Sequence, residues 1–392
     1  MIYTPRQYQI EAADKAVSFL TSSTRHNAIE VLPTGSGKSL IIAMIASRLG
    51  SPILIFQPSK EILEQNLAKL EAYGYRGAVY SASKGRQEIS EITLATIGSV
   101  VNKADLFTNF PYVIIDECHL VNAQEGMYKT FLAEMEKAGA KVLGLTATPY
   151  RLASNSFGSE LRFLTRTRPK VFHEMIYFVQ NRKLFDAGYL AKMEYANRNG
   201  FDRECLQVNS TGADYTDESV QRYYRALNFQ DKIVSAIERE MEIRRNALVF
   251  TRFVKESEYL VNNIPGSAII TGETKKKDRE RIIEGFKCGD IPVVCNVGVL
   301  TTGFDYPELE TIILARPTMS LGLYYQMIGR GIRPHQKKDC CRVVDLCGNF
   351  KTFGRVEDLQ IVDGGNGKWF ITANGKQLTN ICNPRGGREG VF

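Results

Sequence analysis

The sequence lacks any long apolar run. No uninterrupted apolar stretch in its 392 residues approaches the roughly 20 residues that a membrane-spanning helix needs. The first residues, 1–6, also lack the basic region and apolar core of a secretory signal. Eight cysteines are present, but no Cys-x-x-Cys pair offers the spacing of a zinc site. These absences predict a cytoplasmic protein with reduced thiols and no membrane segment.

Strong charge is also absent. Lys and Arg number 50 against 43 Asp and Glu, which gives a net charge of +7. A mild positive charge is compatible with a polyanionic partner but is equally common in proteins that bind none. The length is too great for a single core and predicts two α/β domains with some additional chain.

Apolar strands alternate with amphipathic helices twice along the chain. The predicted strands lie at 28–32, 53–56, 92–95, 112–115 and 141–145, and then at 246–250, 268–271, 292–295, 311–314 and 342–345. The predicted helices lie at 40–49, 61–72, 255–263, 278–287 and 321–330. This alternation is typical of parallel sheets, so we predict an α/β fold with two tandem parallel-sheet domains.

Composition and turn residues predict the structure of the rest of the chain. The polar and aromatic stretch 151–228 predicts a linker into the second domain. Beyond residue 350, Asn-Gly turns flank 368–372 and predict a small β-hairpin. The predicted divisions are 1–165, 166–350 and a tail at 351–392.

The segment Val31-Leu-Pro-Thr-Gly-Ser-Gly-Lys-Ser39 predicts a P-loop, because it joins a strand to a helix start where backbone N–H groups can face phosphates. Lys38 would reach the β- and γ-phosphate oxygens, and the Ser39 hydroxyl would bind Mg²⁺. Leu32 replaces the first glycine of the strict pattern, which disfavours small kinases and signalling GTPases. Taken alone, the segment could be a glycine-rich turn with a solvated lysine. The predicted cofactor-binding residues here are Thr34, Gly35, Ser36, Gly37, Lys38 and Ser39.

The segment Tyr112-Val-Ile-Ile-Asp-Glu-Cys-His119 is an apolar strand that ends in two acids and a histidine. Asp116 would hold Mg²⁺, and Glu117 would orient and deprotonate the water that attacks the γ-phosphate. His119 would relay the nucleotide state. Such residues are often a solvated turn, but a P-loop upstream favours the catalytic interpretation.

Eight motifs stand in an order that resembles superfamily-two helicases. They are Arg6-x-Tyr8-Gln9, the P-loop, Gln57-Pro-Ser-Lys-Glu61, Asp116-Glu-Cys-His119, Leu145-Thr-Ala-Thr-Pro149, Phe250-Thr-Arg252, Leu300-Thr-Thr-Gly-Phe-Asp305 and Gln326-x-x-Gly-Arg-Gly-x-Arg333. The resemblance implies two RecA-like domains with ATP in the cleft between them and nucleic acid across their tops. The later motifs look closest to RadD-type bacterial DNA repair helicases, although the cysteine-rich zinc module of those proteins does not follow the motor motifs here.

The last motif explains the need for a second domain. Arg330 and Arg333 lie three residues apart on one face of the predicted helix, so both could reach the γ-phosphate as arginine fingers. By resemblance, Gln326 lies near the γ-phosphate, and Gly303 and Asp305 lie near the nucleotide sugar. An arginine-bearing helix can otherwise be a solvated face.

The resemblance also implies two further roles. Gln9, with Arg6 beside it, would read the adenine edge and favour ATP. Thr146 and Thr148 would couple hydrolysis to the nucleic-acid site.

Small and polar residues that follow strands predict a nucleic-acid rim, because backbone N–H groups and hydroxyls can hold phosphates. Singly, each could be an ordinary loop residue. Phosphate contacts carry no base code, so binding should be largely independent of sequence and sensitive to salt. The predicted rim residues are Ser59, Lys60, Thr96, Gly98, Arg252, Gly272 and Thr301.

Together these features predict an ATP- and Mg²⁺-dependent DNA helicase or translocase that acts in repair, recombination or replication, with repair or replication proteins as partners. Three alternatives remain. They are an RNA helicase, the motor of a restriction or defence nuclease whose nuclease is a separate chain, and a non-catalytic nucleic-acid clamp. The intact P-loop, acidic and arginine motifs disfavour the clamp.

Overall fold

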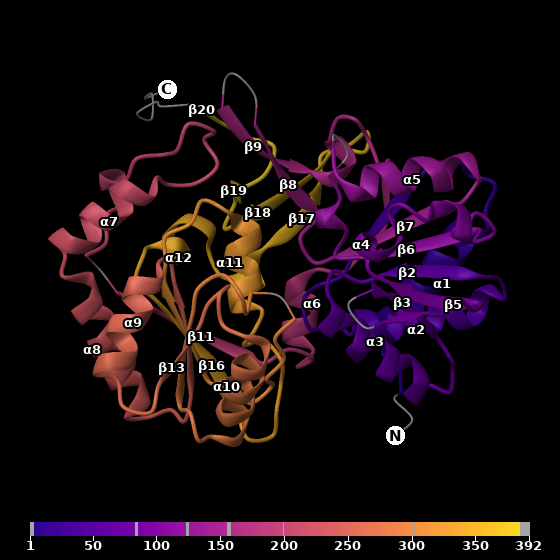
Figure 1. Cartoon of the computed structure of the whole chain (residues 1–392). Coiled ribbons are helices and arrows are strands. Elements are labelled where there is room, and N and C mark those ends of the chain that lie inside the picture. The colour runs from indigo at the N-terminus through magenta and orange to yellow at the C-terminus, as the bar shows by residue number, and fades with distance from the viewer. Residues whose placement is uncertain are drawn as a thin grey trace. The chain divides into compact units, whose positions relative to one another are not determined.

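The computed structural model describes residues 4–82, 85–122, 125–154, 158–198, 200–301 and 303–384, which form two compact units (Figure 1). Unit 1 contains the described residues of Met1–Arg151, Arg162–Gln180 and Asp363–Trp369. Unit 2 contains those of Leu152–Leu161, Asn181–Val362 and Phe370–Phe392. Each unit has its own parallel sheet, as the alternation of strands and helices predicts.

The sheet of unit 1 has the strand order β10-β1-β7-β6-β2-β5-β3-β4. All its neighbours pair in parallel except β3 and β4. Strands covered on both faces read as continuous apolar runs, as 53–56 does. The bounds are β1 Ala28–Val31, β2 Ile53–Phe56, β3 Ala78–Ser81, β4 Arg86–Gln87, β5 Ile92–Ala95, β6 Tyr112–Asp116, β7 Lys141–Thr146 and β10 Glu174–Phe178.

Helices cover both faces of this sheet. In Figure 1, α2 and α3 lie below the strands and α5 lies above them. The bounds are α1 Gln7–Thr21, α2 Lys38–Leu49, α3 Lys60–Ala72, α4 Ile97–Val100 and α5 Met127–Lys137, with short 3₁₀ turns at Ala104–Phe107, Cys118–Leu120 and Leu164–Arg166.

The sheet of unit 2 is parallel throughout, in the order β11-β16-β15-β12-β14-β13. Alternate residues point to opposite faces, so Ala247 and Val249 join a core under α7, α8 and α9 that also contains Tyr224, Phe229 and Ile233. The bounds are β11 Lys192–Asn197, β12 Ala247–Thr251, β13 Ala268–Ile270, β14 Val293–Asn296, β15 Thr311–Ala315 and β16 Cys340–Asp345.

The helices of unit 2 lie on both faces of its sheet, with α8 and α9 on one side and α10 and α11 on the other (Figure 1). The bounds are α6 Asn181–Asp186, α7 Asp217–Ala226, α8 Phe229–Met241, α9 Val254–Asn263, α10 Lys276–Cys288, α11 Leu321–Ile328 and α12 Asn349–Phe353, with 3₁₀ turns at Arg203–Cys205 and Val356–Asp358.

Two small sheets use the remaining strands, in the orders β17-β18-β19 and β20-β9-β8. Strands β18 and β19 pair in antiparallel fashion around Asn374 and Gly375, whose φ angles are 50° and 78°. Positive φ at both central residues is what a tight hairpin turn requires. The bounds are β8 Tyr150–Ser154, β9 Gly158–Phe163, β17 Gln360–Asp363, β18 Trp369–Ala373, β19 Lys376–Gln377 and β20 Cys382–Pro384.

The prediction of a linker at 151–228 is wrong. This stretch supplies β10, an edge strand of the first sheet, β11, an edge strand of the second, and the helices α6 and α7. Edge strands need less apolar sequence than central ones, and β11, Lys-Met-Glu-Tyr-Ala-Asn, is mixed in composition, whereas β10, Glu-Met-Ile-Tyr-Phe, is a short apolar run within the otherwise polar stretch.

The helix predicted over 321–330 is shorter than expected, because α11 ends at Ile328 and both motif arginines follow it. Gly329 and Gly331 lower helix propensity there. Gly331 also has no room for a side chain, since a Cβ would lie 2.2 Å from Cys341 Sγ.

Among the described residues, no helix combines the length and the apolar character required to cross a membrane. The cysteines whose side chains are described are all free, and Cys205 and Cys288 are the exposed members of that group.

Replacing Glu30 by methionine is expected to stabilise unit 1. Glu30 is completely buried on β1, and its two carboxyl oxygens have no hydrogen-bond partner among the described residues. Burial raises the pKa of this carboxyl well above its ordinary value of 4.5. Removing an unsatisfied buried polar group should raise the free energy of unfolding by about 1–3 kcal/mol.

Thermal unfolding across a pH series measures this effect. The unfolded chain loses the Glu30 proton at a lower pH than the folded chain does, so wild-type stability falls as the pH rises through this interval. The advantage of Glu30→Met should therefore grow as the pH rises above the ordinary pKa of 4.5. A variant less stable than wild type at every pH would show that Glu30 has a favourable interaction.

Candidate nucleotide and nucleic-acid site

Three neighbouring strands bring the predicted nucleotide-binding motifs of unit 1 together. Strands β1, β7 and β6 are adjacent and parallel, so the segments after their carboxyl ends meet at one edge of the sheet. These segments carry the P-loop, Thr146 to Thr148, and the acidic motif. Ligands bind at such edges in open parallel sheets.

The P-loop has the backbone that phosphate binding needs. Gly35 and Gly37 have φ angles of 79° and 80°, in the region that favours glycine, and α2 begins at Lys38. The loop therefore presents its amide groups at a helix start, where anions are stabilised. At Gly37 a Cβ would also lie only 2.6 Å from Gln9 Nε2, so a larger residue would displace the Gln9 amide.

Lys38 and the acidic motif form one connected group of side chains. Lys38 Nζ lies 3.3 Å from Glu117 Oε1, and His119 Nδ1 lies 3.4 Å from Glu117 Oε2. His119 Nδ1 is also 3.0 Å from Thr146 Oγ1, which accepts a hydrogen bond from the Thr148 amide at 3.0 Å. A continuous polar path thus connects the P-loop to the residues after β7.

The two acids have opposite pKa shifts. Burial, reinforced by the neighbouring Glu117 charge, raises the pKa of Asp116 to about 6. Burial also disfavours ionised Glu117, but the Lys38 ammonium and His119 outweigh it and hold the pKa of that carboxyl below its ordinary value. Glu117 also has a φ of 52°, which is uncommon for a residue other than glycine and is typical of functional sites. Glu117 is therefore an ionised carboxylate that can accept a hydrogen bond, and the Lys38 ion pair lowers its affinity for a proton.

The oxygens predicted to bind Mg²⁺ converge on one amide. The Ser39 hydroxyl donates to Asn66 Oδ1, and Asn66 Nδ2 donates to Gln57 Oε1 at 2.7 Å and to Asp116 Oδ2 at 3.5 Å. Hydroxyl and carboxylate oxygens are the donors that Mg²⁺ prefers, so these residues fit the ion. Asn66 is a buried residue of α3 that sequence reasoning did not select.

Replacing Asn66 by alanine is expected to weaken Mg²⁺-dependent nucleotide binding about tenfold, as for other residues that orient metal ligands. Its Oδ1 accepts a hydrogen bond from the Ser39 hydroxyl, which leaves the lone pairs of that hydroxyl for the metal. Fluorescent ADP titrated with Mg²⁺ measures this binding without turnover. The control is Gln65→Ala on the exposed side of the same helix, and equal Mg²⁺ requirements in the two variants would remove Asn66 from this role.

Gln9 lies against the P-loop. Its Nε2 and the Tyr8 hydroxyl both donate to the Ser36 carbonyl, at 2.8 and 2.7 Å, while Gln9 Oε1 accepts from the Arg6 amide. The side chain thus fixes the start of α1 to the P-loop. Adenine recognition by Gln9 and Arg6 stays a prediction.

The predicted nucleic-acid residues lie at the carboxyl edges of both sheets. In unit 1, Ser59 and Lys60 follow β2, and Thr96 and Gly98 follow its neighbour β5. The hydroxyl of Ser59 caps α3 by accepting from the Ile62 amide at 3.3 Å. In unit 2, Arg252, Gly272 and Thr301 follow the adjacent strands β12, β13 and β14.

Arg252 is engaged within unit 2. Its Nε lies 2.8 Å from Asp217 Oδ1, its Nη1 lies 3.2 Å from Asp214 Oδ2, and its Nη2 donates to the Tyr215 carbonyl at 2.7 Å. The side chain is only 9% exposed. Sequence reasoning gave Arg252 a phosphate contact and missed these acids, which lie 35 and 38 residues before it.

Arg252→Ala is therefore expected to lower the free energy of unfolding by about 3 kcal/mol, because Asp214 would lose its partner. Asp217→Asn should cost much less, since Asp217 is 69% exposed. Denaturant unfolding of both variants tests this. A contact between Arg252 and a DNA phosphate stays a separate prediction. If it exists, the log–log plot of DNA affinity against salt concentration should be less steep for Arg252→Ala than for wild type, by about one unit of slope.

The arginine motif is held in place within unit 2. Arg330 Nη1 donates to the Phe304 carbonyl at 2.7 Å, and Arg333 forms an ion pair with Asp305. These bonds join the segment after α11 to the loop that contains Gly303, whose φ is 74°. Gln326 lies on α11, where its carbonyl accepts from Arg330 Nε at 3.3 Å.

Two family models match the chain. The model described as "Type III restriction enzyme, res subunit" matches residues 2–151, and the "Helicase conserved C-terminal domain" matches residues 228–335. Their order agrees with the order of the two sheets.

Relatives of known name extend over most of the chain. It is 24% identical to the putative ATP-dependent helicase IRC3 of Saccharomyces cerevisiae, over 88% of this chain and 51% of that protein. It is also 24% identical to the DNA 3'-5' translocase XPB2 of Sulfurisphaera tokodaii, over 85% of this chain and 79% of the relative. The chain spans about half to two thirds of the length of the first curated relatives it matches.

A solved structure supports the fold. A fragment of a putative HsdR subunit of a type I restriction enzyme from Vibrio vulnificus superposes with a TM-score of 0.66 at 21% identity, over 90% of this chain and 66% of that one. Both family models and both relatives agree, so the chain is similar to superfamily-two helicases over most of its length.

Proposed function

We propose that this chain is a nucleic-acid-stimulated ATPase that converts ATP hydrolysis into movement on DNA and so unwinds or remodels duplexes. The observation that carries the proposal is the polar path from Lys38 through Glu117 and His119 to Thr146. Loss or gain of a γ-phosphate at Lys38 would change the partner of Glu117, and His119 would pass that change to the residues after β7.

Each residue of the path has a chemical task in this proposal. Lys38 leaves Glu117 to bind the β- and γ-phosphates, and the freed Glu117 carboxylate accepts the proton of the attacking water. Mg²⁺, held by Ser39 and Asp116, would neutralise charge on the phosphates when bound. Arg330 and Arg333 stabilise the charge that spreads over the transferring phosphoryl group.

The substrate of this proposal is DNA, gripped largely without regard to sequence. The translocase relative is named for DNA, and the rim residues are hydroxyl, glycine and basic residues suited to phosphates. A role in repair, recombination or replication, and the resemblance to RadD-type motors, belong to this proposal.

A second candidate is the motor of a restriction or defence system. The description of the first family model and the HsdR fragment favour it. Residues 1–392 carry no Pro-Asp…Glu-x-Lys nuclease cluster, so in this candidate function they supply the motor and not the cleavage.

The test is steady-state ATP turnover with single-stranded DNA, duplex DNA, forked DNA and matched RNA. Stimulation by DNA and not by RNA supports the proposal. Equal or greater stimulation by RNA supports an RNA helicase, and no turnover with any of them favours a clamp.

A further inference from the structure

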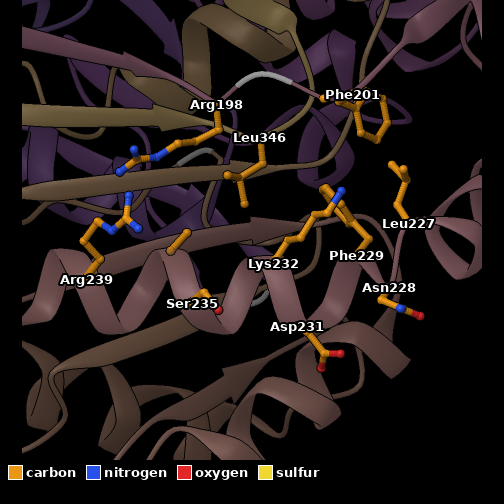
Figure 2. A pocket seen from close by; sticks show the side chains of 12 residues that line it. Arg198, Phe201, Leu227, Asn228, Phe229, Asp231, Lys232, Ser235, Arg239 and Leu346 are labelled. Carbon is orange, nitrogen blue, oxygen red and sulfur yellow. The ribbon is translucent and has the colours of Figure 1, made fainter.

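Unit 2 contains a cavity of about 530 Å³ away from the motifs discussed above (Figure 2). One wall is α8, and the others are the segments that follow the carboxyl ends of β11 and β16. Helix α8 packs over β12 and β15, whereas β11 and β16 form the edge of the sheet beyond it. The cavity lies beside α8, over the edge strands β11 and β16 that this helix does not cover.

Basic side chains line the cavity. Lys232, Ser235 and Arg239 recur on α8 at spacings of three and four residues, which places them on one face of the helix. Figure 2 shows Arg239 and Arg198, which follows β11, extending toward one another, whereas Lys232 extends toward the end where Phe201 and Phe229 lie. Two cations that converge in this way repel each other unless an anion lies between them.

Little in the protein neutralises these cations. Arg198 lies 3.6 Å from Glu240, but Glu240 also pairs with Arg342 at 2.8 Å. Within the part of the chain that the structure describes, Lys232 and Arg239 form no ion pair or side-chain hydrogen bond. Asp231 also lines the cavity, but it accepts a hydrogen bond from the Tyr259 hydroxyl at 2.6 Å.

The other end of the cavity is apolar. Phe201, Leu227 and Phe229 lie together there in Figure 2, and the ring centroids of Phe201 and Phe229 are 5.5 Å apart. Phe229 and Leu346 are buried and form a fixed floor, while Phe201 is partly exposed. Aromatic rings of this kind are platforms on which bases stack.

We propose that this cavity binds one nucleotide unit of a single-stranded nucleic acid, with the phosphate between Arg198 and Arg239 and the base against Phe201. The proposal rests on the proposed function, because it extends the nucleic-acid track of the same motor. The volume lies in the range of small-ligand sites. Guanidinium groups hold phosphate oxygens through paired N–H bonds, and the cavity opens beside the carboxyl edge where Arg252 and Thr301 also lie.

The test uses a fluorescein-labelled oligothymidylate and the double variant Lys232→Gln/Arg239→Gln in the full chain. Loss of one neutralised phosphate of a single strand lowers the salt dependence by about 0.7 units of log–log slope, and the cavity holds one phosphate, so the slope of the double variant should fall by about that amount. The matched control is Lys192→Gln/Lys287→Gln, which removes the same charge from exposed positions at the start of β11 and the end of α10. The control should keep the wild-type slope.

The apolar end has its own variant. Phe201→Leu keeps an apolar side chain but removes the ring, and it should weaken oligothymidylate binding at least about fivefold because the base can no longer stack. An oligonucleotide carrying 5-iodouracil should also crosslink, on irradiation, to the peptide that contains Phe201. Thermal unfolding of each variant shows whether the core remains intact.

The outcomes separate this proposal from the proposed function. If wild-type protein does not bind the oligonucleotide, the cavity proposal is overturned, whereas the proposed function fails only if no DNA, single-stranded, duplex or forked, stimulates ATP turnover. If wild type binds and the double variant matches its control, the cavity proposal alone is overturned. It is overturned equally if the double variant loses binding of a glutamate-rich, phenylalanine-containing peptide while oligonucleotide binding is unchanged, because the cavity would then dock a protein.

Discussion

Replacing Lys38 by alanine or Glu117 by glutamine is expected to abolish ATP hydrolysis in both cases, but with opposite effects on nucleotide binding. Lys38→Ala removes a phosphate ligand, so ATP binding should weaken. Glu117→Gln frees Lys38 from its ion pair of 3.3 Å, so ATP should bind at least as tightly as in wild type. General-base catalysis is typically worth about 10²–10⁴ in rate, which sets the size of the loss for Glu117→Gln.

Turnover and fluorescent-nucleotide binding, measured on the same preparations, check both parts. Because both side chains are partly exposed, neither substitution should shift thermal unfolding by more than a few degrees. Near-normal steady-state hydrolysis by Glu117→Gln would rule out its role as the base. Tighter ATP binding by Lys38→Ala would rule out the lysine as a phosphate ligand.

Removal of the motif arginines should have a comparable effect on turnover. Arg330→Ala and Arg333→Ala should each lower the rate of hydrolysis about 10³-fold or more, the usual contribution of an arginine finger, and weaken nucleotide binding less. The effect is expected from residues almost 300 positions beyond the P-loop, so it would show that hydrolysis requires unit 2 as well as unit 1.

The lysine variants separate this role from a structural one. Arg333→Lys can keep an ion pair with Asp305. If Arg333 only held the loop that contains Asp305, this ion pair would be enough to preserve ATP turnover. Lysine cannot reproduce the planar fork of a guanidinium on a phosphoryl group, so its turnover should remain low. Full activity of Arg330→Lys and Arg333→Lys would show that Arg330 and Arg333 have a structural role and not a catalytic one.

Local patterns made much of the fold predictable. Strands such as β2 and β5 are buried on both faces, so they are recognisable in the sequence as mainly apolar runs. The observed bounds of both strands agree with the predicted ones. The P-loop was recognisable because its glycines are required by backbone φ angles that other residues rarely adopt. The three segments that meet at one edge of the sheet of unit 1 were also recognisable, because each carries a motif that follows an apolar strand. They are the P-loop, the acidic motif and Thr146 to Thr148.

Long-range contacts were not predictable in this way. Nothing near Arg252 in the sequence indicates that it will bind Asp214 and Asp217. These residues come together only when the chain folds. Asn66 likewise looks like any polar residue on a helix until α3 packs beside the P-loop. The edge strand β11 was missed because its sequence is only partly apolar, and β10 was missed because its short apolar run lies in an otherwise polar stretch.

Displacement of a triplex-forming strand tests the central claim most directly, since it detects movement along a duplex without requiring unwinding. A third DNA strand is bound to one end of a duplex, and its release is followed with ATP, with ADP and with no nucleotide. We expect ATP-dependent release by wild type, with a lag that grows with the length of duplex between the free end and the triplex, and no release by Glu117→Gln. DNA-stimulated hydrolysis without any release of the third strand, on duplexes of every length, would contradict this claim.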